Sequence, residues 1–227
     1  GAGEAEWHNW YDFFPWEDWR EGRPAIIDRT IRPNLQNWID TIGDGDIGDT
    51  YRERLSIAFG TGAASWDFER VLERYELLYE AGMIGEALRD AQISATISGQ
   101  LVPQPDAGTL ATAELLGTPM ALDNRRVLAT ALGRIRGKLK YRPVVFDLLA
   151  PTFTLLQLQR VVEALGGVRL HKQNFRRLVI NGGLVEPTGH RESQARGRPA
   201  ELFRFRREIL SEGSTPGIGL PAARIIG

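Results

Sequence analysis

The sequence contains no cysteine among its 227 residues and only three histidines. The absence of cysteine excludes disulfide bonds, thiolate metal sites and cysteine nucleophiles, and suits the reducing cytoplasm, where we expect this protein. No run of 18 apolar residues is present, so we predict no membrane span and no membrane partner. His8, His171 and His190 are far apart and show no metal-ligand spacing. We therefore predict no metal site, and no Ser/His/Asp arrangement marks a catalytic residue.

The net charge of -1 hides a strong asymmetry along the chain. Residues 1–122 hold 9 Lys and Arg against 21 Asp and Glu, a net charge of −12. Residues 123–227 hold 19 against 8, a net charge of +11. This split indicates an acidic module joined to a second module that can meet a polyanion.

Apolar residues at helical spacing predict that most of residues 1–119 is helical. Together these residues form an acidic, mostly helical region that we expect to be regulatory. The pattern predicts helices over 23–40, 50–60, 66–90 and 123–141, with Gly82 as a stop signal. Pro and Gly residues predict a turn-rich loop over 43–50 and a linker over much of 98–119. We place a winged helix-turn-helix at 120–211 and a flexible tail at 212–227.

Two short amphipathic segments flank Gly166 and Gly167. In the first, Thr154 can cap a helix that has one apolar face: Leu155, Leu158, Val162 and Leu165. In the second, residues 171–181, a rotation of about 100° per residue places Leu178 and Val179 beside Phe175 on the buried side. The outward face then carries Gln173 and Arg177, with three further polar residues beside them: Asn174, Arg176 and Asn181.

Amide and guanidinium groups on one exposed helix face suit the recognition of double-stranded DNA. Arg can bond guanine in paired fashion, and Asn or Gln can bond adenine in the same way. Lys172 lies in the first turn, where it can meet a phosphate together with the exposed backbone N–H groups. The residues predicted to contact DNA from this helix are Lys172, Gln173, Asn174, Arg176 and Arg177.

A basic β-hairpin follows this helix. Residues 184–185 and 202–206 predict short strands, and Phe203 and Phe205 alternate with Arg204 and Arg206. The loop between them carries Arg191 and two arginines predicted to contact DNA, Arg196 and Arg198. The expected fold is mainly α with a small β-hairpin wing, in which a helical N-terminal region precedes a C-terminal winged helix-turn-helix.

A polar helix face is also what ordinary solvation produces, and winged helices also serve protein–protein contacts. Solvation alone is enough to explain the polar face of this helix. It does not explain why the arginine-rich loop, the basic hairpin face and the positive charge of the module occur together. The DNA-binding interpretation accounts for all of them, and a protein-interaction scaffold is the alternative that remains.

Residues 122–207 resemble the C-terminal domain of the Nudix-related transcriptional regulators of NAD metabolism. The resemblance rests on the order and spacing of five stretches: "RVLATALGRIRGKLKYRPVVFDLL", "FTLLQLQRVVEAL", "LHKQNFRRLV", "GLVEPTG" and "GRPAELFRF". A weaker similarity joins "FFPWEDWREGRPAIIDRTIRPNL" to the segment that follows the Nudix core in a divergent branch of these regulators. This similarity implies that residues 1–119 are a Nudix-derived or regulatory region. The resemblance implies a repressor that binds a palindromic operator as a homodimer. It also implies a nucleotide effector such as ADP-ribose, with no cofactor held by this chain.

The Nudix resemblance raises an alternative function, hydrolysis of nucleotide diphosphates. The nearest approach to the Mg²⁺-binding Nudix box is residues 75–83, where Glu76, Glu80 and Gly82 fit the pattern. Tyr75 replaces the arginine and Tyr79 replaces one metal-binding glutamate. Counting back, Asp67 falls where the isolated glutamate belongs, and Thr61 falls where the first glycine belongs. The family order places the true box before residue 7, so we predict no catalysis by these residues.

Four of the six tryptophans lie in "WHNWYDFFPWEDW", residues 7–19. Such a cluster can form a stacking platform for an adenine base, or it can pack between helices. Aromatic side chains most often do the second, and we predict core packing for five of them: Trp7, Trp10, Phe14, Trp16 and Trp19. The segment "GDGDIGD" resembles a calcium loop only loosely and lacks the closing glutamate, so we interpret it as a turn.

Overall fold

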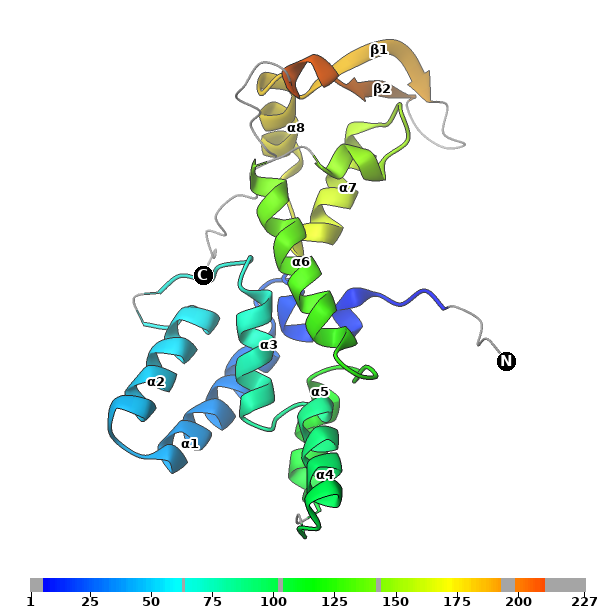
Figure 1. Ribbon diagram of the computed structural model, residues 1–227. Coiled ribbons are helices and arrows are strands. Elements are labelled where there is room, and N and C mark those ends of the chain that lie inside the picture. The colour runs from blue at the N-terminus through cyan, green and yellow to red at the C-terminus, as the bar shows by residue number, and fades with distance from the viewer. Residues whose placement is uncertain (1–5, 63, 102–103, 142–143, 193–198, 211–227) are drawn as a thin grey trace. The chain divides into compact units, whose positions relative to one another are not determined.

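The computed structural model describes residues 6–62, 64–101, 104–141, 144–192 and 199–210 (Figure 1). The chain divides into two compact units, Gly1–Gly133 and Arg134–Gly227, which are called unit 1 and unit 2 below. The described part is helical apart from one antiparallel hairpin, which confirms the predicted fold class. The units divide within a helix, whereas the sequence placed the boundary before it, at 119/120. The tail expected at 212–227 lies outside the described residues.

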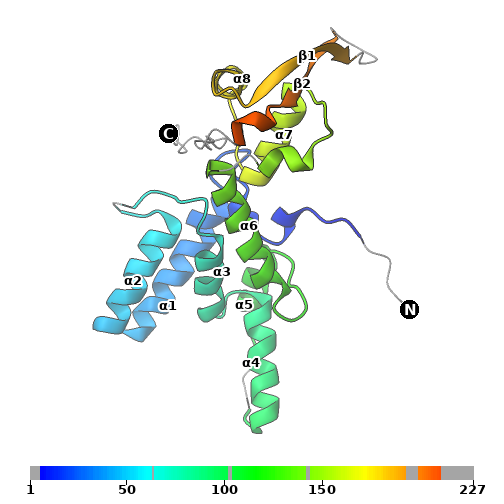
Figure 2. The same ribbon diagram turned by 45° about the horizontal axis from the view of Figure 1, so that its top comes forward.

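Unit 1 is built from helices only, within its described residues. They are the 3-10 helices η1 (Trp10–Asp12) and η2 (Pro15–Glu17), the π-helix η3 (Ile27–Ile31), and the α-helices α1 (Arg32–Ile42), α2 (Asp46–Phe59), α3 (Val71–Glu80), α4 (Gly85–Ser98) and α5 (Ala107–Leu115). Helix α6 (Asn124–Tyr141) begins in unit 1 and ends in unit 2. Helices α1 and α2 lie side by side in both Figure 1 and Figure 2. The ring centroids of Trp38 and Tyr51, one from each helix, are 4.8 Å apart. None of the described helices is both long and apolar enough to cross a membrane.

Three details of unit 1 differ from the sequence prediction. Helix α2 begins at Asp46, inside the predicted turn, because Asp46 and Asp49 in its first turn suit the positive end of the helix dipole. The helix expected over 66–90 is two helices separated at Gly82, whose φ of 68° supports the stop signal. The expected linker contains α5, which starts where the Asp106 side chain accepts a hydrogen bond from the Thr109 N–H.

The core of unit 1 is built around the aromatic segment. Phe14 and Trp16 are fully buried and Trp19 is 7% exposed, which confirms core packing for these three. Trp19 meets Trp66 with ring centroids 4.7 Å apart. The prediction is wrong for Trp7, which is 99% exposed because it precedes the first helix and meets no neighbouring element.

A buried ion pair joins η2 to α3. Glu17 and Arg74 are both fully buried, and the Nε of Arg74 donates to Oε1 of Glu17 at 2.5 Å. Arg74 also donates through Nη1 to the backbone oxygens of Ala58 and Asp67, at 2.8 and 2.9 Å. Its guanidinium lies over the Trp66 ring, 4.0 Å from the centroid. One side chain therefore ties together η2, the end of α2 and the loop before α3.

A second buried arginine, Arg125 at the start of α6, closes unit 1 on its N-terminal segment. Its Nη1 lies 3.0 Å from Oε2 of Glu86, and its Nε donates to the backbone oxygen of Phe13 at 2.8 Å. Nearby, the Thr118 N–H donates to the Asp12 oxygen at 3.0 Å. Gly117, with φ of 88°, lies so close that a Cβ there would come within 2.7 Å of the same Asp12 oxygen. Backbone hydrogen bonds and a buried ion pair thus join segments of unit 1 that are far apart in sequence.

Unit 2 contains two helices and a hairpin beyond α6. Its elements are the 3-10 helix η4 (Val144–Leu148), α7 (Leu155–Gly166), α8 (Lys172–Asn181), β1 (Val185–Glu192), β2 (Ala200–Phe205) and the 3-10 helix η5 (Arg207–Leu210). Figure 2 shows α8 nearly end-on, with the hairpin running away from it. Val185 pairs with Phe205 and Glu192 pairs with Ala200, and the register shifts between Pro187 and Arg191.

The hairpin is anchored by its apolar side. Phe203 of β2 exchanges two backbone hydrogen bonds with Phe153, at 2.8 and 2.9 Å. Phe205 stacks on Phe146 of η4, with ring centroids 4.3 Å apart. The alternation predicted for this strand is confirmed, since Phe203 is buried while Arg204 is exposed. The wing therefore has a fixed base against η4 and the start of α7.

Candidate nucleic-acid interface

The predicted cap of α7 is present. The Thr154 hydroxyl accepts from the Gln157 N–H at 3.2 Å, and the Gln157 side chain accepts from the Thr154 N–H at 2.7 Å. The four residues predicted to form its apolar face are all buried: Leu155, Leu158, Val162 and Leu165. Gly167 ends the helix with φ of 70°. This capped helix is the platform on which α8 is placed.

Two polar residues of α7 hold the turn that leads into α8. The Gln159 Nε2 donates to the backbone oxygen of Leu170 and to Oε1 of Glu163, each at 2.9 Å. The same Glu163 oxygen accepts from the Leu170 N–H at 2.8 Å. Both backbone groups of Leu170 are thereby bonded, one residue before the cap of α8 at His171. Sequence reasoning missed this clamp, because polar residues within an amphipathic helix are usually solvated.

Helix α8 presents the polar face that the sequence predicts. Phe175 and Val179 are buried, whereas the residues predicted to contact DNA are all exposed: Lys172, Gln173, Asn174, Arg176 and Arg177. The prediction that Leu178 lies on the buried side is wrong. Leu178 is 45% exposed because it lies at the edge of the narrow buried strip formed by Phe175 and Val179.

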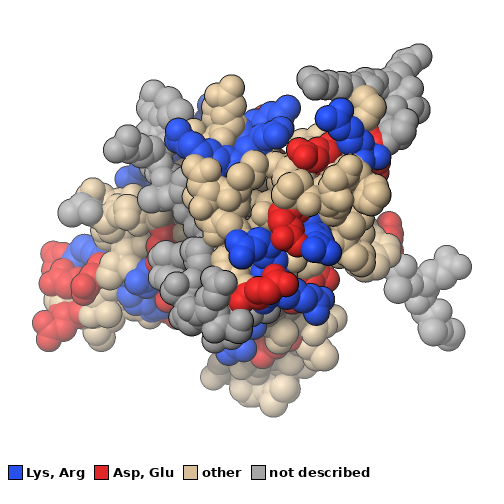
Figure 3. All heavy atoms as spheres, turned by 90° about the horizontal axis from the view of Figure 1, so that it is seen from above, with Lys and Arg blue, Asp and Glu red and all other residues tan. Residues whose placement is uncertain are grey.

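The cations of this face are not neutralised by any carboxylate among the described residues. Lys172, Arg176 and Arg191 form no ion pair with any described residue, and Arg177 makes one 3.4 Å hydrogen bond to the Asn174 side chain. Elsewhere, most described arginines are paired with carboxylates, as Arg204 is with Glu186 on the hairpin. Figure 3 looks down on α8 and the hairpin, and blue Lys and Arg side chains predominate over red ones in its upper half. A row of unpaired cations is suited to bind an external polyanion.

The wing is described only in part. Arg191 is exposed at the end of β1, beyond a turn that contains Gly189 with φ of 78°. The Thr188 hydroxyl donates to the Leu202 backbone oxygen at 3.0 Å and steadies this bulged end of the hairpin. Arg196 and Arg198, predicted to contact DNA, lie outside the described residues.

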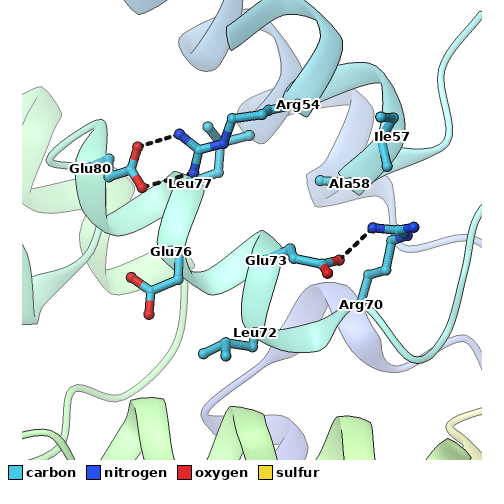
Figure 4. A pocket seen from close by; sticks show the side chains of 9 residues that line it. All are labelled: Arg54, Ile57, Ala58, Arg70, Leu72, Glu73, Glu76, Leu77 and Glu80. Carbon is cyan, nitrogen blue, oxygen red and sulfur yellow. Dashed lines mark hydrogen bonds and ion pairs between the residues drawn. The ribbon is translucent and has the colours of Figure 1, made fainter. Parts of the chain in front are cut away.

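The Nudix-like stretch in unit 1 carries carboxylates that are already paired. Figure 4 shows a pocket of about 360 Å³ between α2 and α3, where Arg54 holds Glu80 through two hydrogen bonds of 2.6 and 2.8 Å. These bonds lower the pKa of Glu80. Glu76, in the same pocket, is bonded by Arg126 at 2.6 Å. Each carboxylate that a metal ion would need is thus engaged by a guanidinium group.

The remaining members of that stretch have structural roles. Burial raises the pKa of Tyr75 to about 12, and the Tyr79 hydroxyl donates to Asp90 at 3.0 Å. Asp67 accepts from the Glu69 N–H at 2.9 Å and so caps the turn before α3. Thr61 donates its N–H to the Ser56 oxygen at 3.0 Å, at the end of α2. Among the described residues, no group of three or more His, Asp or Glu side chains can hold a metal ion.

Comparison with known proteins finds similarity in the part of the chain that contains α7, α8 and the hairpin. Residues 145–205 match the family described as the NrtR DNA-binding winged helix domain. The chain is 36% identical over 92 residues to the ADPR responsive transcriptional repressor NtrR of Acinetobacter baylyi, a match that covers 40% of this chain and 36% of the relative. The chain therefore spans little more than a third of that curated relative.

Two solved structures are similar to about the same fraction of this chain. The crystal structure of Shewanella oneidensis NrtR complexed with a 27mer DNA is 35% identical, covers 41% of this chain and 42% of that one, and has a TM-score of 0.36. A second crystal structure of Shewanella oneidensis NrtR is 34% identical, with the same coverage of both chains and a TM-score of 0.34. The similarity to known proteins thus lies in the C-terminal part of the chain, where residues 145–205 match a winged helix domain.

Proposed function

We propose that this protein is a transcriptional repressor of NAD-related metabolism that binds double-stranded DNA through α8 and the wing. The observation that carries the proposal is the exposed row of amide and guanidinium groups on α8, whose cations have no ion-pair partner among the described residues. The match of residues 145–205 to a DNA-binding winged helix domain supports it. The residues assigned to DNA are Lys172, Gln173, Asn174, Arg176, Arg177, Arg196 and Arg198.

In this proposal α8 lies in the major groove. Gln173 and Arg177 are one helical turn apart on the exposed face, so both can reach base edges together. Lys172 and Arg176 flank them and meet backbone phosphates, which position the helix without reading sequence. The clamp from Gln159 and Glu163 fixes where α8 begins, and therefore which side chains enter the groove.

The proposal includes control by an effector and binding as a homodimer. A relative that shares the winged helix region is named as responsive to ADPR, which supports an ADP-ribose-like nucleotide as the signal. Two copies of one winged helix related by a two-fold axis match the two half-sites of a palindromic operator. Release of DNA on addition of ADP-ribose, measured by fluorescence anisotropy, tests the effector assignment.

Replacing Arg177 with alanine is expected to weaken binding to a selected duplex by about 1–3 kcal/mol and to relax the preference at one base position. The reason is the loss of a bidentate pair of hydrogen bonds from the guanidinium group to one base. The duplex is first selected by the wild-type protein from a random library, and affinity is measured by anisotropy. Arg160→Ala removes an equal charge from an exposed position on α7 and serves as the control. Equal losses for the two variants, on selected and unselected duplexes alike, contradict base reading by Arg177.

The chain is expected not to hydrolyse ADP-ribose in the presence of Mg²⁺. Glu76 and Glu80 are held by Arg126 and Arg54, so a metal ion would have to displace a guanidinium group from each carboxylate. Release of AMP, followed by chromatography, is the measurement. Turnover that disappears in both Glu76→Gln and Glu80→Gln would show that these carboxylates are catalytic.

A further inference from the structure

A cleft of about 480 Å³ lies within unit 2, between the beginnings of α7 and α8 and the hairpin. Each of the three elements contributes polar side chains to it: Thr154 and Gln159 from α7, Lys172 and Arg176 from α8, and Arg191 and Glu201 from the hairpin. Apolar side chains of α7 and β2 line the rest. The cleft therefore joins the proposed recognition helix to the wing.

The polar groups of α7 in this cleft are already used. Thr154 takes part in the capping box, and Gln159 donates both to Glu163 and to the Leu170 backbone. The side chains left without a bond to any described residue are all charged: Lys172, Arg176, Arg191 and Glu201. Three cations against one carboxylate favour an anion over a neutral ligand.

The backbone at the start of α8 adds to this preference. His171, the residue that precedes the helix, provides no side-chain cap. The N–H groups of the first turn therefore lack the partner that a Ser, Thr or Asp would supply, and they carry the positive end of the helix dipole. Lys172, which lies in that turn, also lines the cleft.

We infer that this cleft binds one phosphate group of the DNA backbone, held by Lys172 and Arg176 from α8 and by Arg191 from the wing. The inference rests on the proposed function and adds Arg191, with a defined location, to the residues that contact DNA. Because the cations come from two separate elements, the phosphate links the wing to α8. This contact positions the protein on any sequence, since a phosphate carries no base information.

Glu201 limits the strength of this contact. It lies directly opposite Arg191 in the strand register, and residues opposite one another in antiparallel strands share a face of the sheet. The two side chains form no ion pair, so the carboxylate stays in the cleft as a negative charge that a phosphate must approach. Neutralising it is expected to strengthen DNA binding.

The test measures the affinity of the full chain for selected and unselected duplexes between 50 and 400 mM salt, concentrations chosen to span about one decade. Arg191→Ala is expected to weaken both duplexes about tenfold at the lower salt and to reduce the salt slope by roughly one. Arg160→Ala, matched in charge but outside the cleft, is expected to change the slope by much less. Glu201→Gln is expected to tighten both duplexes by about threefold to tenfold.

The outcomes separate the cleft from the proposed function. If Arg177→Ala weakens the selected duplex while Arg191→Ala behaves like Arg160→Ala, DNA binding stands and the phosphate site is wrong. If Glu201→Gln fails to tighten binding, the cleft is also wrong. Titration of the protein with inorganic pyrophosphate and with ADP, followed by calorimetry, tests whether the cleft binds a free phosphate compound instead of DNA. Tight binding of ADP that Arg191→Ala abolishes, with DNA binding unchanged, would make a nucleotide the occupant and overturn the assignment to DNA.

Discussion

Replacing Arg74 with methionine is expected to lower the free energy of unfolding of unit 1 by about 3–5 kcal/mol. The substitution removes one partner of a fully buried ion pair and leaves the buried Glu17 carboxylate without the Arg74 guanidinium. It also removes the donors that bond the Ala58 and Asp67 backbone oxygens. All six tryptophans lie in unit 1, so tryptophan fluorescence during urea unfolding reports on this unit alone.

Two further variants test the cause. Arg54→Met breaks the ion pair with Glu80, which is more than one third exposed, and is expected to cost less than about 1 kcal/mol. Combining Arg74→Met with Glu17→Leu removes both buried charges and is expected to recover part of the loss. A cost for Arg74→Met no greater than that for Arg54→Met would contradict the role assigned to burial.

Replacing Phe175 with alanine is expected to destabilise unit 2 by about 3–5 kcal/mol and to abolish DNA binding as a consequence. Phe175 is the aromatic side chain that α8 buries, at 5% exposure, and truncating it leaves a cavity beneath the proposed recognition face. Unfolding of unit 2 is followed by hydrogen exchange of the α7 and α8 amides. Tryptophan fluorescence, which reports on unit 1, is expected to keep its native spectrum.

Leu178→Ala is the matched control on the same helix. It removes a large apolar side chain that is 45% exposed, so the expected cost is below about 1 kcal/mol. Similar losses of stability in Leu178→Ala and Phe175→Ala would show that Leu178 is buried in solution, as the helical rotation had suggested. They would then also contradict the exposed face described for α8.

Local signals in the sequence were sufficient to predict much of the secondary structure of unit 2. Thr154 followed by Gln157 predicts a capped helix, the glycine pair predicts its end, and the alternation at Phe203 and Phe205 predicts the wing strand. These features depend on neighbours in sequence. The exposure of Leu178 depends on how wide a strip of α8 is covered, which periodicity alone does not determine.

The structural features that the sequence did not predict depend on contacts between distant residues. Glu17, Arg74, Glu86 and Arg125 are charged, and charged residues are rarely buried unless they are paired. Their partners lie far away in the chain, 57 residues away for Arg74 and 39 for Arg125. The clamp formed by Gln159 and Glu163 was not predicted for the same reason. Both side chains bond to the Leu170 backbone, which lies beyond the turn that follows α7. The cleft likewise exists only once α7, α8 and the hairpin are assembled.

The contact between Arg125 and the Phe13 backbone spans 112 residues, so unit 1 is not complete until the start of α6 has been synthesised. The segment that contains Phe14 and Trp16 is synthesised before α6, and the Arg125 guanidinium lies over both rings only after the start of α6 has been added and has folded back. Until then this apolar stretch of the nascent chain has no complete burial site, the condition under which chaperones engage. Because contacts between residues so far apart in sequence form slowly, we expect the docking of Arg125 on the Phe13 segment to be a late step in the folding of unit 1.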